Sequence, residues 1–162
     1  MSSVTPLPTD RLATAVAFAT TRVPVAPPDR AVDDLLRDLR GRTFDSAAAV
    51  AVCVDDRLGG VATLERVLAA PDGAVLADVM DPDPPVAAPQ VDPEPAVWRS
   101  VQQGEAGIAV VGDGRRFLGF IPPDRLIGIL VDEHAEDLAR VGGFLRGAES
   151  ARAASTEGVA RR

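Results

Sequence analysis

The stretch GGVATLERVL, residues 59–68, recurs 59 positions later as LGFIPPDRLI, residues 118–127. Each stretch begins as an apolar run of strand type, contains a glycine (Gly60 or Gly119) and continues into a helical pattern. In the second stretch Pro122 begins a proline pair that ends the strand and favours the first turn of a helix. Similar stretches at a fixed spacing are typical of an internal repeat. The sequence therefore predicts two copies of one structural unit.

The elements around these two stretches come in the same order twice. Each copy has an extended run, an amphipathic helix, two apolar strands joined by a turn, and the start of a second helix. In the first copy these elements are expected at residues 22–26, 32–39, 48–54, 58–62 and 64–70. In the second copy they are expected at residues 86–88, 97–101, 108–111, 117–121 and from residue 122 onward. The pattern predicts an α/β fold of two β-α-β-β-α units with pseudo-two-fold symmetry, flanked by N- and C-terminal helices.

The order of the elements also predicts where the chain divides. Residues 1–21 are expected to form a lead with a short helix, residues 22–79 the first unit and residues 80–141 the second. Beyond Gly142-Gly143 the composition shifts to alanine, serine, glutamate and arginine, which is too polar to bury a broad face. Residues 142–162 are therefore expected to form an alanine-rich helix or a linker toward a further domain.

The composition excludes several classes of protein. A net charge of −7 over 162 residues, without a dense run of arginine, argues against nucleic acid as a partner, because phosphate binding needs a basic surface. No stretch reaches the roughly 20 apolar residues that cross a bilayer, so we expect a soluble chain without direct membrane insertion by this segment. The one cysteine, Cys53, lies in the apolar run AVAVCV and is expected in the core.

A concentrated acidic segment follows the second copy of the repeat. Asp132 lies four positions before Glu136, and Glu133 four before Asp137, so like charges lie side by side on one helix face. His134 falls on the apolar face and is expected in the core. Clustered carboxylates without cysteine suit a hard cation such as Mg²⁺, although an ordinary solvated acidic face is the alternative. The predicted metal ligands are Asp124, Asp132, Glu133, Glu136 and Asp137.

The repeat, in which a strand with a glycine leads into a polar position and a helix, resembles the cystathionine-β-synthase (CBS) domain, which occurs in tandem pairs. The segment ADVMDPDPPVAAP, residues 77–89, resembles the joint between two such domains, and AFATT, residues 17–21, faintly matches their usual entry. The run VDEHAEDLARVGG, residues 131–143, is similar to the acidic helix after the second CBS domain of MgtE-type magnesium transporters. The resemblance covers residues 18–145. It implies a cytoplasmic homodimer that works with the transmembrane domain of an inner-membrane transporter, on the same chain or on another.

The resemblance also implies a cleft for an adenine nucleotide such as ATP. In the CBS family a serine or threonine after the glycine strand holds phosphate, and an aspartate three residues on holds the ribose. Thr63 keeps the first role, whereas Arg66 and Arg125 stand at the aspartate positions and Pro122 replaces the second hydroxyl. Arginine has no acceptor for ribose hydroxyls, but it can grip phosphate with two parallel hydrogen bonds. The implied cleft residues are Thr63, Glu65, Arg66, Asp124 and Arg125.

Three functional hypotheses follow. The leading hypothesis is a cytosolic regulatory CBS pair of an MgtE-like transporter of magnesium or another divalent cation, gated by bound Mg²⁺. The alternatives are a free-standing CBS regulator that binds adenine nucleotides, and a dimerisation module without a ligand. We expect no enzymatic activity, because the acidic residues share one helix face and a catalytic triad would have to recruit His134.

Overall fold

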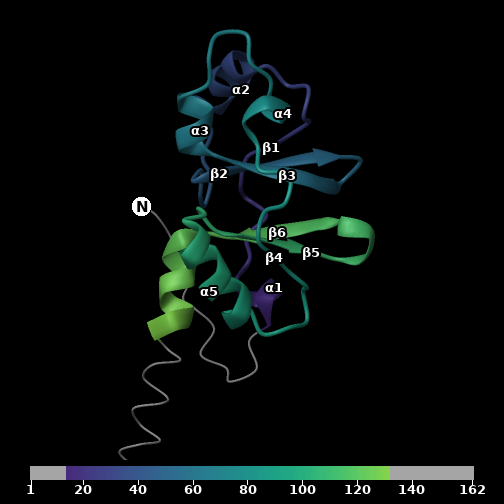
Figure 1. Cartoon of the computed structure of the whole chain (residues 1–162), viewed down its shortest axis with the longest axis vertical. Coiled ribbons are helices and arrows are strands. Elements are labelled where there is room, and N and C mark those ends of the chain that lie inside the picture. The colour runs from purple at the N-terminus through teal and green to yellow at the C-terminus, as the bar shows by residue number, and fades with distance from the viewer. Residues whose placement is uncertain (1–13, 132–162) are drawn as a thin grey trace, which may run out of the picture. The chain divides into compact units, whose positions relative to one another are not determined.

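The computed structural model describes residues 14–131, which form two three-stranded sheets with helices beside them (Figure 1). The strands are β1 (Val25–Ala26), β2 (Ala49–Val54), β3 (Arg57–Thr63), β4 (Val86–Ala87), β5 (Ile108–Val111) and β6 (Phe117–Ile121). The helices are α1 (Ala15–Phe18), α2 (Val32–Leu39), α3 (Leu64–Leu68), α4 (Leu76–Val79), α5 (Glu94–Gln103) and the one-turn 3₁₀ helix η1 (Asp113–Arg115). Residues 123–131 are also helical.

The chain divides into two compact parts, residues 1–127 and residues 128–162, and both sheets belong to the first part. Of the second part, the structure describes residues 128–131. None of the helices within residues 14–131 is long and apolar enough to cross a bilayer. The predicted domain boundaries at residues 21, 79 and 141 stay a prediction.

The two sheets have the same topology. In each one a short first strand pairs in parallel with the central strand, which pairs in antiparallel with the third, giving the orders β1-β2-β3 and β4-β5-β6. Val25 pairs with Ala51 in the first sheet, and Val86 pairs with Ala109 in the second. Each antiparallel pair has a register shift at the same place, after Val52 in the first sheet and after Val110 in the second. The predicted α/β fold of two repeated units is confirmed.

The repeat spacing differs slightly from strand to strand. Gly60 and Gly119 are 59 positions apart and pair with Val52 and Val110, which are 58 positions apart. The difference arises in the hairpins, because β2 and β3 are joined by a two-residue turn, whereas β5 and β6 are joined through η1. The two turns therefore need different numbers of residues between equivalent strands.

In each sheet a short segment from elsewhere in the chain forms a β-bridge with the third strand. Thr20, just after α1, forms a bridge with Phe120 on β6, and Asp81, just after α4, forms a bridge with Val61 on β3. Accordingly α1 packs against β6 although it precedes the first sheet in the sequence. Figure 1 shows this arrangement, with α2, α3 and α4 beside the first sheet and α1 and α5 beside the second.

Two hydrophobic cores can be described among residues 14–131. One lies within the first unit of the repeat and joins side chains of β2 and β3 to α2, α3 and α4, among them Val50, Leu35 and Leu76. The other contains residues of both sheets, including Ala51 and Phe120. Burial of apolar surface at roughly 25 cal/mol per Å² is the main force that stabilises both cores.

Cys53 is partly buried at the edge of the core that contains both sheets. Desolvation raises the pKa of its thiol to about 11, and the neighbouring carboxylate of Asp56 acts in the same direction. The reactive thiolate is therefore scarce at neutral pH. Cys53 is a packing residue, as the sequence predicts, although it is not fully enclosed.

Candidate functional site

Thr63 ends β3 and caps the N-terminus of α3. The residue is 9% exposed, and its hydroxyl oxygen accepts a hydrogen bond from the Arg66 backbone N–H at 3.3 Å. A threonine at this position satisfies one of the free N–H groups of the first helical turn. The hydroxyl keeps its own O–H, which remains able to donate to a phosphate. The structural role of Thr63 and the implied binding role are therefore compatible.

The side chain of Arg66 extends toward the repeat unit that contains the second sheet. Its Nη2 lies 3.9 Å from Oε1 of Glu105, in the loop between α5 and β5. The Arg66 side chain is 48% exposed, whereas that of Glu105 is only 10% exposed. An almost buried carboxylate needs a partner to offset its lost hydration, so this ion pair links the two units of the repeat. Glu65, beside Arg66, is exposed.

Arg125, the counterpart of Arg66, has different partners. Its Nη1 donates to the backbone carbonyls of Phe18 at 2.8 Å and Ala19 at 3.4 Å. These carbonyls lie at the C-terminus of α1, where backbone acceptors have no partners within the helix. Asp124 is exposed in the first turn of the helix at residues 123–131, a position that favours a carboxylate. Arg125 thus attaches α1 to the second unit of the repeat.

The structure brings some of the predicted cleft residues together and separates others. Thr63 and Arg66 share one helical turn through their hydrogen bond, and Asp124 and Arg125 share the corresponding turn of the second unit. Pro122 is the counterpart of Thr63 in the second unit. It is fully buried and has no hydroxyl group. Glu105 is a charged residue that sequence analysis missed. It lies in the short loop between Gly104 and Gly107, in no recognisable sequence pattern, and only the contact with Arg66 identifies it.

The predicted metal site falls mainly on residues that lie outside the described part of the chain. These residues are Asp132, Glu133, Glu136 and Asp137. His134, which is expected in the core, also lies outside the described residues. Within residues 14–131 no group of three or more histidine, cysteine, aspartate or glutamate side chains is placed to hold a metal ion. The metal ligands therefore stay a prediction.

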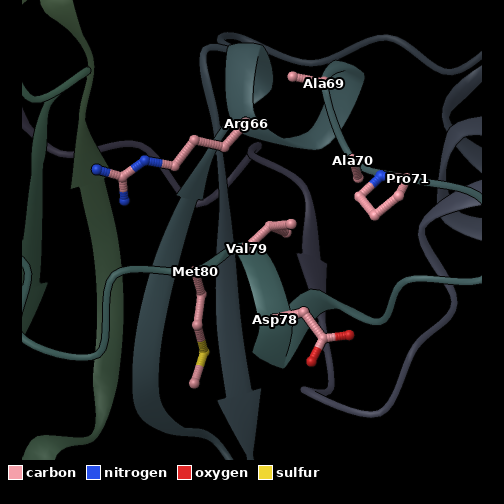
Figure 2. Close-up of a pocket in the computed structure, with 7 residues that line it drawn as sticks. All are labelled: Arg66, Ala69, Ala70, Pro71, Asp78, Val79 and Met80. Carbon is pink, nitrogen blue, oxygen red and sulfur yellow. The ribbon is translucent and has the colours of Figure 1, made fainter.

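A shallow cavity of about 400 Å³ lies between α3 and α4 (Figure 2). Its lining residues are Arg66, Ala69, Ala70, Pro71, Asp78, Val79 and Met80. Figure 2 shows the Arg66 side chain directed away from Ala69, Ala70 and Pro71. The carboxylate of Asp78 accepts a hydrogen bond from the Val75 backbone N–H at 3.0 Å. The lining of the cavity is therefore mostly apolar, with the cationic side chain of Arg66 and the carboxylate of Asp78 as its charged groups.

Comparison of the sequence with protein-family models and with curated proteins gives no match. Comparison of the structure with solved structures gives many. The cytosolic domain of the Mg²⁺ channel MgtE in complex with ATP is 20% identical, with a TM-score of 0.66 over 72% of this chain and 48% of that one. The soluble part of a magnesium transporter is also 20% identical, with a TM-score of 0.66 over 75% of this chain and 48% of that one.

A third similar structure is CBSX2 in complex with AMP, which is 21% identical, with a TM-score of 0.61 over 75% of this chain and 98% of that one. The aligned part of this chain therefore covers nearly the whole length of the CBSX2 chain. The chain spans only about half the length of the two magnesium-transport structures. At these identities the likeness concerns the fold, and the predicted repeat is part of that likeness. The protein has the fold of a tandem CBS-domain pair that resembles the cytosolic part of MgtE.

Proposed function

We propose that the protein is a regulatory, non-catalytic CBS pair of an MgtE-like magnesium transporter, and that it responds to bound Mg²⁺. The observation that carries the proposal is the likeness of the fold to the cytosolic part of MgtE. The acidic run that follows the second CBS unit in the sequence supports it. The transmembrane domain would belong to the same protein or to a separate chain.

The proposed response depends on electrostatic repulsion. Asp132 and Glu136, and likewise Glu133 and Asp137, are like-charged pairs at a helical spacing of four. On a helix each pair would be unfavourable by about 0.2–0.5 kcal/mol. A bound divalent cation would remove this repulsion, and a ligand shifts an equilibrium by as much as its affinity for the two states differs. Mg²⁺ would thus favour a more compact assembly.

The proposed assembly is a homodimer. Leu68 on α3 and Trp98 and Val101 on α5 are large apolar side chains that remain 44–64% exposed. Aromatic side chains are enriched at protein interfaces. These positions support self-association through the helices. Sedimentation at increasing protein concentration measures it, and Trp98→Ala, which removes the largest of the three side chains, is expected to raise the dissociation constant.

Isothermal titration of the protein with MgCl₂ tests the metal response. We expect a saturable heat that is lost in the variant Glu133→Ala plus Asp137→Ala. The variant Asp72→Ala plus Asp83→Ala removes two exposed carboxylates from the CBS units and so changes the net charge equally. It is expected to bind as the wild type does. An equal loss in both variants would show general charge screening instead of a site, and no heat in the wild type would reject the proposal.

A second candidate function is the sensing of an adenine nucleotide, favoured by the position of Thr63 at the end of β3 and by the AMP and ATP complexes of similar folds. Titration with AMP and ATP in metal-free buffer measures it. Thr63→Val is expected to weaken binding, whereas Thr63→Ser keeps the hydroxyl and is expected to retain it. Saturable nucleotide binding together with no response to Mg²⁺ would favour this function over the first.

A further inference from the structure

The structure places two equivalent arginines in different settings. Arg66 and Arg125 are 59 positions apart, as are Val61 and Phe120 on the preceding strands, so each arginine occupies the same turn of its own unit. Arg125 donates to the carbonyls of Phe18 and Ala19 at the end of α1. Arg66 instead approaches the carboxylate of Glu105 in the other unit. Arginines at equivalent positions of the two units thus make different contacts.

The carbonyls that Arg125 binds have close counterparts beside Arg66. Thr20 pairs with Phe120 as Asp81 pairs with Val61, which makes Ala19 equivalent to Met80 and Phe18 equivalent to Val79. Both positions end a four-residue helix with nearly the same backbone, since Ala19 has φ −76° and ψ 153° and Met80 has φ −75° and ψ 154°. The Val79 and Met80 carbonyls are therefore presented to Arg66 much as Phe18 and Ala19 are presented to Arg125.

The cavity lies where this second contact would form. Arg66, Val79 and Met80 all line it, and Figure 2 shows the Arg66 side chain directed away from Ala69, Ala70 and Pro71. The guanidinium instead lies 3.9 Å from the carboxylate of Glu105. In the second unit Arg125 already spans the corresponding gap between its helix and α1. The cavity beside α4 is thus associated with the outward position of Arg66.

We propose that Arg66 is a two-position latch. In the outward position it pairs with Glu105, joins the two CBS units and leaves the cavity open. In the inward position it donates to the Val79 and Met80 carbonyls, attaches α4 to α3 and covers the cavity. An anion that binds Arg66, or a cation that binds Glu105, shifts the balance between the two positions. The latch does not depend on the ligand of the proposed function.

Carbon-13 NMR of the labelled protein tests the latch, because a carbonyl carbon moves to lower field when its oxygen accepts a charged hydrogen bond. In Glu105→Gln we expect the Val79 or Met80 carbonyl resonance to move to lower field and the Arg66 Nε–H to exchange more slowly with water. In Arg66→Ala plus Glu105→Gln the resonance is expected to stay at its wild-type position. The Phe18 and Ala19 carbonyls, bound by Arg125, are the internal control and should not move.

A salt titration of the wild type provides a second measurement that requires no variant to fold. Raising NaCl from about 0.1 M to about 1 M shortens the screening length from ~10 Å to ~3 Å and weakens the partly exposed pair with Glu105. The Val79 or Met80 resonance is then expected to move in the same direction as in Glu105→Gln. Unchanged resonances at high salt, or in a folded Glu105→Gln protein, would overturn the latch.

Discussion

At the scale of single residues, two glycines decide how closely the segments after α1 and α4 approach the third strands of the sheets. A Cβ atom on Gly60 would lie 2.6 Å from the Asp81 carbonyl oxygen and 2.7 Å from the Met80 sulfur. A Cβ on Gly119 would lie 3.0 Å from the Ala19 side chain. These are the places where the segments after α4 and α1 cross the third strands. Gly60 and Gly119 are therefore required for the close approach of these segments to the third strands.

We expect Gly60→Ala to lower the free energy of unfolding by about 1–3 kcal/mol, because the backbone of Asp81 must move to admit the methyl group. Gly59→Ala is the matched control, since its Cβ would meet the nearest atom at an ordinary 3.6 Å. Urea denaturation of both variants measures the difference. Equal midpoints for the two variants would contradict the close approach.

Cys53 allows a prediction about pH. Because the pKa of its thiol is raised to about 11, the rate of alkylation by iodoacetamide is expected to keep rising up to about pH 11. For a cysteine at the exposed position 77, in the variant Ala77→Cys plus Cys53→Ala, the alkylation rate is expected to reach half its maximum near pH 8.5. Folding stability contributed by the raised pKa is present below about pH 9 and is lost as the pH rises toward 11. Identical pH profiles would contradict the burial of Cys53.

At the scale of elements, short helices depend on their caps and on their tertiary contacts. The helix α3 has only five residues, and isolated helices of this length are not stable in water. Its first turn is closed by the hydroxyl of Thr63, and its buried residue Val67 contributes to the core of the first unit. The same threonine that resembles a phosphate ligand therefore also stabilises the fold.

Thr63→Ala is expected to lower the free energy of unfolding by about 0.5–2 kcal/mol through loss of the cap. Thr63→Ser keeps the capping oxygen and is expected to change it much less. Thermal unfolding followed by circular dichroism measures both variants. Any binding measurement on Thr63 variants should be compared with these stabilities, and an alanine variant as stable as the wild type would show that the cap is unimportant.

At the scale of the whole molecule, the hairpins of the two CBS units hold one another. Nη1 of Arg57 donates to the Gly114 carbonyl at 3.0 Å, and Nε of Arg115 donates to the Leu58 carbonyl at 3.0 Å. Between them the Phe117 backbone N–H donates to the Asp56 carbonyl at 2.8 Å. The reciprocal contacts follow from the pseudo-two-fold relation of the units. They link the hairpins at their ends, beyond the shared core.

We expect Arg57→Ala plus Arg115→Ala to loosen this end of the molecule. Removing two hydrogen bonds of about 1 kcal/mol each is expected to speed exchange of the Phe117 amide roughly tenfold or more, because each 1.4 kcal/mol corresponds to a factor of ten. Hydrogen exchange followed by NMR measures the rate. Arg116→Ala removes a charge from the same hairpin and is the control. Unchanged exchange in the double variant would show that the hairpins do not depend on these arginines.

The sequence by itself determined the repeat, the two sheets and the α/β class, because strand alternation, turns and helix starts are local patterns that residues 59–68 and 118–127 display twice. It also identified Thr63, whose hydroxyl caps α3 by a hydrogen bond to the backbone of a residue three positions further on. It did not predict that α1 would complete the second sheet, nor that Arg66 and Arg125 would find different partners.

Those features were decided only by the tertiary structure. The contacts of Arg125 with Phe18 and of Arg66 with Glu105 join residues 107 and 39 positions apart. No local pattern encodes which distant carbonyl or carboxylate a long side chain will reach. Packing of the two sheets into a shared core brings these groups together, and the charge of Glu105, almost hidden from water, then selects its partner.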